Sequence, residues 1–296
     1  MRTIGNKAFI TKSLLLWYNR NARPLPWRKT RNPYRILISE IMLQQTQVSR
    51  VLQKYPKFLK RFPNFQILAR AGNGDVIRAW AGMGYNNRAV RLHQTANRII
   101  QDYAGRLPAN IDLLQLLPGI GRYTAHAVAC FSFGQHTAVV DTNVRRILSR
   151  LFPRMARSHD EWELAESMLP KRKAYEWNQA LMELGSAFCT AAHPDCAGCP
   201  LHRYCPSAFL LMKKKPVERK AHTIIPNRIY RGRIIAALRR IAHHRSIETN
   251  RMAKMIKPDF SSRQKKWLDA LLNGLLRDGL IHIHSRSKKI YISLPR

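Results

Sequence analysis

Two acidic residues, Glu40 and Asp141, lie in sequence settings that differ in polarity. Glu40 is predicted to sit on a helix, where three of its four same-face neighbours are apolar. Those neighbours are Ile36, Leu37, Leu43 and Gln44. Removal from water raises the pKa of a carboxyl group, which suits a general acid near neutral pH. A buried Glu bonded to a nearby amide or Arg is the alternative.

Asp141 follows the apolar run 138–140 and directly precedes a predicted helix that begins at Thr142. Aspartate is a favoured helix N-cap, and bonded backbone N–H groups would keep its carboxylate ionised. A protonated acid and a carboxylate in contrasting settings form the arrangement that breaks glycosidic bonds. The acid protonates the leaving group, and the anion faces the developing oxocarbenium ion. A plain helix cap remains the alternative for Asp141.

Four of the five cysteines fall within a short segment with the spacing C-x6-C-x2-C-x5-C. They are Cys189, Cys196, Cys199 and Cys205. An intracellular chain rarely uses such a cluster for disulfides, and four thiolates suit either a [4Fe–4S] cluster or zinc. The fifth, Cys130, lies in an apolar helix and is predicted to be plain core.

The run 116–125 reads Leu-Leu-Pro-Gly-Ile-Gly-Arg-Tyr-Thr-Ala. Gly119 and Gly121 can take positive φ, and they leave backbone N–H groups exposed at the start of the next helix. Such a helix start can cradle a phosphate oxygen. We therefore predict a helix–hairpin–helix that grips a nucleic-acid backbone without reading bases. An ordinary helix–turn–helix corner is the alternative.

Helical periodicity positions these residues, and the predicted fold class is mainly α up to about residue 211. One helix starts near Pro33 and carries apolar residues as far as Val48. The other predicted helices cover 65–71, 74–83, 88–103, 111–117, 122–133, 142–151, 160–168 and 175–189.

Residues 212–227 resemble a linker, and a different pattern follows it. Helices are predicted at 232–243, 249–256 and 261–278, and strands at 280–284 and 289–293 around a polar turn at 285–288. Three helices and a basic hairpin describe a winged-helix-like DNA-binding domain over residues 228–296. A small protein-interaction or dimerisation module is the alternative.

The amino-acid composition limits the kinds of partner that this chain can bind. The chain has 296 residues, of which 45% are hydrophobic, so it is globular. Lys and Arg number 52 against 17 Asp and Glu, a net charge of +35 that predicts a polyanionic partner. No apolar run reaches the roughly 18 residues of a membrane span, and Lys12 interrupts the N-terminal apolar stretch before it could serve as a signal peptide. We expect a cytoplasmic protein, associated with the nucleoid in a bacterium or archaeon.

Residues 14–206 resemble the helix–hairpin–helix DNA glycosylases, and specifically the adenine glycosylases of the MutY type. The matching segments are 25–28 (Leu-Pro-Trp-Arg), 33–34, 39–48, 82–85, 117–125 and 140–146, together with the four cysteines. The resemblance implies a six-helix lobe over about 30–137 and a cluster lobe formed by 1–29 plus 138–211. It also implies a [4Fe–4S] cluster on the four cysteines and a nucleotide flipped out of the duplex.

The resemblance assigns a role to each matching residue. Glu40 would protonate N7 of adenine, and Asp141 would stabilise or trap the sugar cation. Tyr123 and Asn143 would support Asp141. The positions expected to contact DNA or the base are Arg28, Leu43, Gln44, Gln45, Tyr85, Gly119 and Gly121. Arg28 and Gln45 would contact the extruded base or its surroundings, and Gln44 and Tyr85 would probe the vacated space. The implied partner is double-stranded DNA with a mispaired or damaged base, bound by a monomer, with neither a membrane nor a small-molecule substrate.

Position 123 separates two chemistries. Bifunctional relatives carry Lys there and form a Schiff base, which Tyr123 cannot do, so we predict base removal without efficient strand cleavage. A thymine or uracil mismatch glycosylase, which also carries Tyr here, and a DNA-binding regulator with an inactive glycosylase-like body are the alternatives.

The chain departs from the family at three places. Thr142 replaces the usual Gly, and Asn86-Asn87 replaces Tyr-Ala. Residues 217–296 do not match the α/β domain that inspects 8-oxoguanine in typical relatives, and therefore give no indication of the preferred opposite base.

Overall fold

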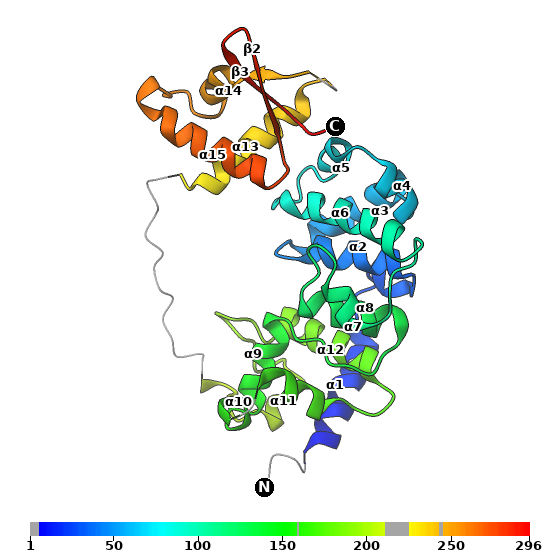
Figure 1. The fold of residues 1–296 in the computed structure, drawn as a ribbon. Coiled ribbons are helices and arrows are strands. Elements are labelled where there is room, and N and C mark those ends of the chain that lie inside the picture. The colour runs from blue at the N-terminus through cyan, green and yellow to red at the C-terminus, as the bar shows by residue number, and fades with distance from the viewer. Residues whose placement is uncertain (1–5, 159, 211–224, 243–244) are drawn as a thin grey trace. The chain divides into compact units, whose positions relative to one another are not determined.

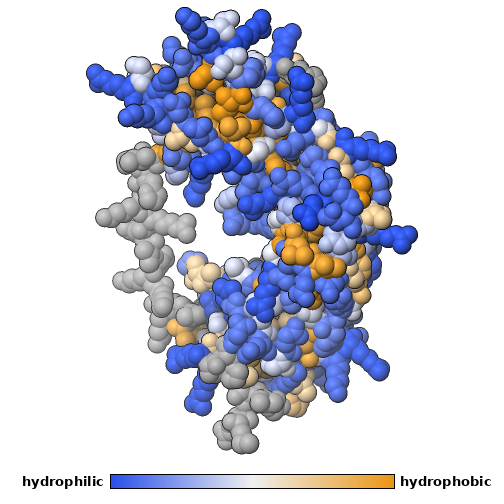
Figure 2. Space-filling view, viewed as in Figure 1, coloured by the Kyte–Doolittle hydropathy of each residue, from blue (hydrophilic) through white to orange (hydrophobic). Residues whose placement is uncertain are grey.

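The computed structural model describes residues 6–158, 160–210, 225–242 and 245–296 (Figure 1). These residues are mainly helical, with a small sheet near the C-terminus, as the sequence predicts. Most of the predicted linker 212–227, namely residues 212–224, lies outside the described residues. Hydrophilic side chains cover most of the face shown in Figure 2. No described helix combines the length and apolar character needed to cross a bilayer.

The chain divides into two compact units. The first unit comprises Met1–Leu37, Ala109–Gln115 and Ile120–Arg219, and the second comprises Ile38–Pro108, Leu116–Gly119 and Lys220–Arg296. The predicted lobes, 30–137 and 1–29 plus 138–211, have other boundaries and stay a prediction.

The first unit is built around α12. Its helices are α1 (Lys7–Asn21), α7 (Ile111–Gln115), α8 (Arg122–Phe133), α9 (Thr142–Leu151), α10 (Met155–Ser158), α11 (Glu161–Met168) and α12 (Ala174–Ala187), with the 3-10 turns η1 (Pro26–Lys29) and η2 (His202–Tyr204). α12 packs against α1, α8 and α9. Leu14, Ile147 and Trp177 are fully buried there, so α12 supplies the core against which the start of α9 is placed.

The helices of the second unit that precede the hairpin are α3 (Val48–Arg61), α4 (Phe65–Arg70), α5 (Asn73–Ala79) and α6 (Asn87–Asp102). They follow α2 (Pro33–Leu43), whose first residues belong to the other unit. The prediction of a single helix that carries apolar residues from Pro33 to Val48 is wrong. α2 stops at Leu43, Gln45 takes a left-handed conformation with φ 53°, and Val48 begins α3.

Helices α1 and α3 were not predicted from the sequence. In α3 the buried residues Val51, Tyr55 and Phe58 keep a helical period, but Pro56 and several charged residues interrupt it. A proline in a helix interior removes one backbone hydrogen bond, so Pro56 argues against a helix at this position in the sequence. In the structure, the packing of the buried residues stabilises the helix in spite of it.

We call residues 225–296 the C-terminal module, which belongs to the second unit. It contains α13 (Asn227–Arg240), β1 (Ile247–Glu248), α14 (Thr249–Ile256), η4 (Ser262–Gln264), α15 (Lys265–Arg277), β2 (His282–Arg286) and β3 (Lys289–Ser293). Strand β3 lies between β1 and β2, and all pairings are antiparallel. The predicted helices and hairpin are present, whereas β1 was missed because two residues are too short to show a period.

Ile247 and Ile283 both pair with Ile292 in the sheet of the C-terminal module. Ile292 is fully buried, as is Met252 of α14. The β2–β3 turn uses Ser287 and Lys288 at φ 48° and 60°, the left-handed pair that a two-residue hairpin loop requires. The hairpin therefore projects a short basic turn from a small apolar core.

Candidate active site

Asp141 is the N-cap of α9, as predicted. Its Oδ1 accepts hydrogen bonds from the backbone N–H of Asn143 (2.8 Å) and Val144 (2.7 Å). Its Oδ2 accepts a third from Nδ2 of Asn143 at 2.8 Å. The three donors hold the carboxyl group in one orientation at the start of the helix.

Asn143 connects Asp141 to the cysteine segment through Arg146. Nη2 of Arg146 donates to Oδ1 of Asn143 (2.7 Å), and its Nε donates to the carbonyl oxygen of Cys189 (2.6 Å). Gly185 of α12 lies against this group, since a Cβ built on it would fall 2.6 Å from Cβ of Asn143. A glycine is therefore required for α12 to approach α9 this closely.

Glu40 lies on α2 in the second unit and is only 4% exposed. Its helix neighbours Ile36 and Leu37 are buried, which matches the apolar setting predicted for it. Its assignment as an acid stays a prediction, because Glu40 and Asp141 belong to different units.

The segment after α2 and the turn before α6 present several of the predicted DNA-contacting side chains. Gln45 is exposed, and Leu43 and Gln44 are half-buried. Nε2 of Gln44 donates to the carbonyl oxygen of Gly119 at 3.5 Å. Tyr85 is 54% exposed and takes φ 41°, an uncommon conformation for a bulky residue.

Arg88 links these two segments, and no function was predicted for it from the sequence. Its guanidinium donates to the carbonyl oxygens of Ile41, Met42, Gln44, Met83 and Gly84 and to the hydroxyl of Thr46. Arg88 is 7% exposed, and burial lowers its pKa to about 10. A cation in the first turn of a helix opposes the helix dipole, and that unusual position was the one signal available.

The helix–hairpin–helix run is present, with one correction. Only Gly119 takes a positive φ, 80°, whereas Gly121 has φ −89° and forms the N-cap of α8. Gly119 is needed for its backbone conformation, and Gly121 leaves open space at the start of α8, since a Cβ there would meet nothing within 4 Å. Tyr123 lies half-buried in the first turn of α8.

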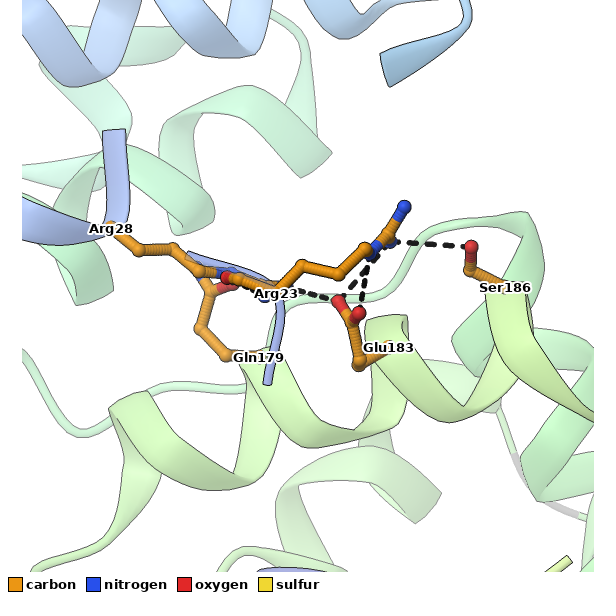
Figure 3. A network of polar contacts seen from close by, with 5 residues as sticks. All are labelled: Arg23, Arg28, Gln179, Glu183 and Ser186. Carbon is orange, nitrogen blue, oxygen red and sulfur yellow. Dashed lines mark hydrogen bonds and ion pairs between the residues drawn. The ribbon is translucent and has the colours of Figure 1, made fainter. Parts of the chain in front are cut away.

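Arg28 forms a network inside the first unit (Figure 3). Its nitrogens donate to Oε1 of Gln179 (2.8 Å), the carbonyl oxygen of Arg23 (3.1 Å) and Oε2 of Glu183 (2.6 Å). The carboxylate of Glu183 also pairs with Arg23. Burial alone would raise the pKa of Glu183, but hydrogen bonds from Arg23 and Arg28 outweigh burial and lower it.

Glu183 was likewise not predicted from the sequence. It lies among buried residues of α12, and an acid at a core position needs a partner. That requirement was the signal, although nothing in the sequence indicated that Arg23 and Arg28 are the partners.

The four cysteines Cys189, Cys196, Cys199 and Cys205 line one cavity, together with Arg150 and Phe188 among others. Arg150 donates to Sγ of Cys189 at 3.2 Å. Burial, together with the neighbouring cysteines, raises the pKa of the Cys199 thiol to about 11. Within the described part of the chain, no three His, Cys, Asp or Glu side chains converge on one metal-ion position. The thiols instead surround a shared space. Cys130, by contrast, is fully buried core, as predicted.

Comparison with known proteins identifies the family. Residues 38–170 match the model of the HhH-GPD superfamily base excision DNA repair proteins. The chain is 44% identical over 207 residues to the adenine DNA glycosylase of Mycobacterium tuberculosis, covering 67% of each chain. It is 41% identical over 234 residues to that of Mycolicibacterium smegmatis, covering 76% of this chain and 79% of the relative.

A solved structure of a thermostable thymine-DNA glycosylase is also similar. It superposes with a TM-score of 0.66 and 32% sequence identity, covering 70% of this chain and 99% of that one. The chain therefore belongs to the HhH-GPD superfamily of base excision DNA repair proteins and, within it, to the MutY-type adenine glycosylases.

Proposed function

We propose that this protein is a DNA N-glycosylase that removes adenine mispaired with guanine or 8-oxoguanine. The observation that carries the proposal is the contrast between two carboxyl groups. Asp141 is fixed by three hydrogen-bond donors in an accessible position at the start of α9, whereas Glu40 is buried on α2 beside the buried positions Ile36 and Leu37. The identity to adenine DNA glycosylases of two mycobacteria supports the choice of base.

In the proposed reaction Glu40 gives a proton to N7 of the flipped adenine. The electron pair of the C1′–N9 bond then leaves with a neutral base, and positive charge develops on the sugar. The carboxylate of Asp141 stabilises or traps that charge, with Asn143 and Tyr123 holding it in place. Water supplies a hydroxyl group to C1′, and its proton restores Glu40.

The exposed loops would contact the duplex. We assign Leu43, Gln44, Gln45 and Tyr85 to the space around the flipped nucleotide, and Gly119 and Gly121 to the backbone of the strand. The exposure of Gln45 and Tyr85 supports this assignment. Arg28 uses three of its five N–H donors inside its own unit, so two remain for the extruded base.

We propose that the four cysteines Cys189, Cys196, Cys199 and Cys205 hold a [4Fe–4S] cluster. The four thiols line one shared cavity, and membership of the HhH-GPD superfamily supports an iron–sulfur cluster over zinc. When bound, the cluster supplies iron–thiolate bonds that fix this loop. A brown protein containing iron and sulfide is expected. Cys199→Ala should lose the colour and Cys130→Ala should keep it, and a colourless zinc protein would refute the cluster.

Tyr123 supports a monofunctional enzyme. A phenol cannot form a Schiff base with the opened sugar, so we infer that the abasic strand leaves the enzyme uncut. Duplex cut without added alkali would contradict this inference.

The test of the proposed function is incubation with labelled duplexes containing A:8-oxoG, A:G, T:G or U:G, followed by alkali. Strand breakage confined to the A:8-oxoG and A:G duplexes is expected. The similarity to a thymine-DNA glycosylase favours that enzyme as the second candidate, and product only from T:G or U:G would select it. Tight binding with no product from any duplex would select a DNA-binding regulator.

We propose that the C-terminal module is a second DNA-binding surface. Residues 217–296 contain 19 Lys and Arg against 5 Asp and Glu. Exposed basic side chains mark the start of α15 and the β2–β3 hairpin. These are Arg263, Lys265, Lys266, Arg286, Lys288 and Lys289. Duplex DNA is the partner that this charge favours.

We further infer that the enzyme acts as a monomer in the cytoplasm, on the nucleoid of a bacterium or archaeon. Light scattering of the purified protein tests the first inference, because a dimer would double the measured mass. Fluorescence of a tagged copy over the nucleoid tests the second, and a signal at the cell envelope would contradict it.

A further inference from the structure

Two arginines join the C-terminal module to α5 within the second unit. Arg78, near the end of α5, donates to the carbonyl oxygens of Arg239 (2.5 Å) and Ile241 (3.0 Å). In return, Nε of Arg239 donates to the carbonyl oxygen of Ile77 (2.9 Å). The last carbonyls of a helix lack partners within the helix. Each arginine therefore caps the helix that carries the other.

Close backbone contacts complete this junction. Nδ2 of Asn73 donates to the carbonyl oxygen of Gly279 (3.2 Å), and its backbone N–H donates to that of Arg296 (3.2 Å). A Cβ on Gly74 would fall 2.3 Å from the carbonyl oxygen of Pro295. The module is thus held at several points along the start of α5 as well as at its end.

Arg239 makes one further bond, to the turn that carries Tyr85. Its Nη2 donates to Oδ1 of Asn86 at 2.8 Å. Asn86 is the N-cap of α6, but its side chain makes no capping bond to that helix. The amide oxygen accepts the hydrogen bond from Arg239 of the C-terminal module instead.

The turn is therefore held from two directions. Arg88 binds the carbonyl oxygens of Met83 and Gly84 on one side, and Arg239 binds Asn86 on the other. Between them stands Tyr85, exposed and in a left-handed conformation that an unsupported bulky residue rarely adopts. Arg239 is itself half-buried, and its pKa is lowered to about 10 by burial and by the nearby charge of Arg78.

We propose that Arg239 is a positioning residue for the turn 82–86, so that the C-terminal module sets the conformation in which Tyr85 meets DNA. The proposal rests on the proposed function for the role of Tyr85. It makes the module part of the base-flipping apparatus, in addition to any contact that its own basic surface makes with DNA.

The test compares variants of the Arg239–Asn86 bond in the full-length protein. Asn86→Ala and Arg239→Gln each remove it, whereas Asn86→Asp keeps an acceptor. Base flipping is followed by stopped-flow fluorescence of 2-aminopurine placed beside the target adenine of an A:8-oxoG duplex, and excision by single-turnover kinetics. We expect both removals to slow flipping roughly tenfold with little change in Kd, and Asn86→Asp to behave like wild type.

Arg240→Gln is the matched control, since it removes the same charge from the next, exposed position of α13. It should leave flipping unchanged. The double variant Asn86→Ala/Arg239→Gln should be no slower than Arg239→Gln alone, which already loses the bond to Asn86 together with the bond to Ile77. Unchanged flipping in the single variants, or a double variant about a hundredfold slower, would overturn the proposal.

Hydrogen exchange in the free protein keeps this test separate from the proposed function. Backbone amides of residues 82–86 should exchange faster in Asn86→Ala than in Arg240→Gln. Equal exchange would refute the positioning role whatever the enzyme does to DNA. Faster exchange in a protein that excises no adenine would support the positioning role and refute the proposed function alone.

Discussion

At the scale of single residues, the orientation of Asp141 is fixed by its neighbours before any substrate binds. Its carboxyl group is bonded to two backbone N–H groups and one amide. Glu40 is buried on α2, where its helix neighbours Ile36 and Leu37 are buried as well. The proposed chemistry therefore assigns the mobile proton to one residue and the fixed negative charge to the other.

Replacing Glu40 tests the first assignment. Glu40→Gln removes the proton and keeps the shape, so single-turnover excision should fall by at least about a hundredfold while the Kd for an A:8-oxoG duplex is retained. Glu163→Gln, on an exposed position of α11, is the control and should remain active. Excision by Glu40→Gln at the wild-type rate would show that Glu40 is not the acid.

The ionisation of Glu183 makes the unfolding free energy of the protein depend on pH. Its pKa is lowered in the folded protein, so its contribution to stability is complete above the pKa of the unfolded chain and is lost as the pH falls through the folded value. Glu183→Gln should cost about 3 kcal/mol of unfolding free energy at pH 7, because it leaves two arginine side chains without their acid.

The measurement is urea unfolding of wild type and Glu183→Gln at several pH values. The difference between the two proteins should shrink from about pH 5 downward. A difference that stays constant to about pH 3 would mean that the carboxylate does not titrate with folding.

At the scale of elements, local signals predicted well and long-range ones did not. Asp141 as a helix cap followed from its own neighbours, and the strands of the hairpin followed from alternation over 280–293. The end of α2 was missed because it depends on Arg88, which lies more than forty positions further along the chain and binds the carbonyl oxygens of Ile41, Met42 and Gln44.

Side-chain partners were the least predictable part of the candidate site. The cysteine spacing predicted a shared site, and the four thiols do line one cavity. Nothing in the sequence paired Arg28 with Glu183 or Arg239 with Asn86, since such pairs depend on which helices pack together.

Gly119 and Gly121 of the helix–hairpin–helix differ in backbone conformation and in the space around them, so alanine should affect them differently. Gly119→Ala places a Cβ at φ 80° and 3.0 Å from Cβ of Arg91, so it should cost about 1–2 kcal/mol of unfolding free energy. Gly121→Ala has open space and an ordinary φ, so stability should change by less than about 0.5 kcal/mol.

For DNA affinity we expect Gly121→Ala, the variant that keeps its stability, to show the loss. A methyl group on Gly121 would occupy the space at the start of α8 that the proposal gives to a phosphate group, so affinity should fall although the fold is intact. Thermal unfolding and fluorescence anisotropy on the same samples check both statements. Full affinity in Gly121→Ala would remove Gly121 from the proposed contact.

At the scale of the whole molecule, the excess of positive charge predicts strongly salt-dependent binding. The net charge is +35, and neutralised phosphates release counterions when a cationic protein binds DNA. The contribution of the C-terminal module can be measured separately, because its basic hairpin is exposed.

The variant Arg286→Gln/Lys288→Gln should lower the slope of log K against log salt by about 1 for each phosphate that it no longer neutralises. Affinity for duplex DNA measured between roughly 50 and 200 mM salt provides the slope. An unchanged slope together with altered self-association would instead identify the module as a protein-interaction or dimerisation surface.

If Asp141 and Asn143 act as proposed, the close approach of Gly185 to Asn143 makes the reaction depend on the spacing of α12 and α9. Adding one carbon atom at position 185 would force α12 and α9 apart or rotate the amide of Asn143 away from Asp141. Substitutions at position 185 would thus slow base release by displacing Asn143, without changing any residue that contacts DNA. A harmful variant at this glycine would be mistaken for a simple folding defect unless the rate of base release were measured on protein that remains folded.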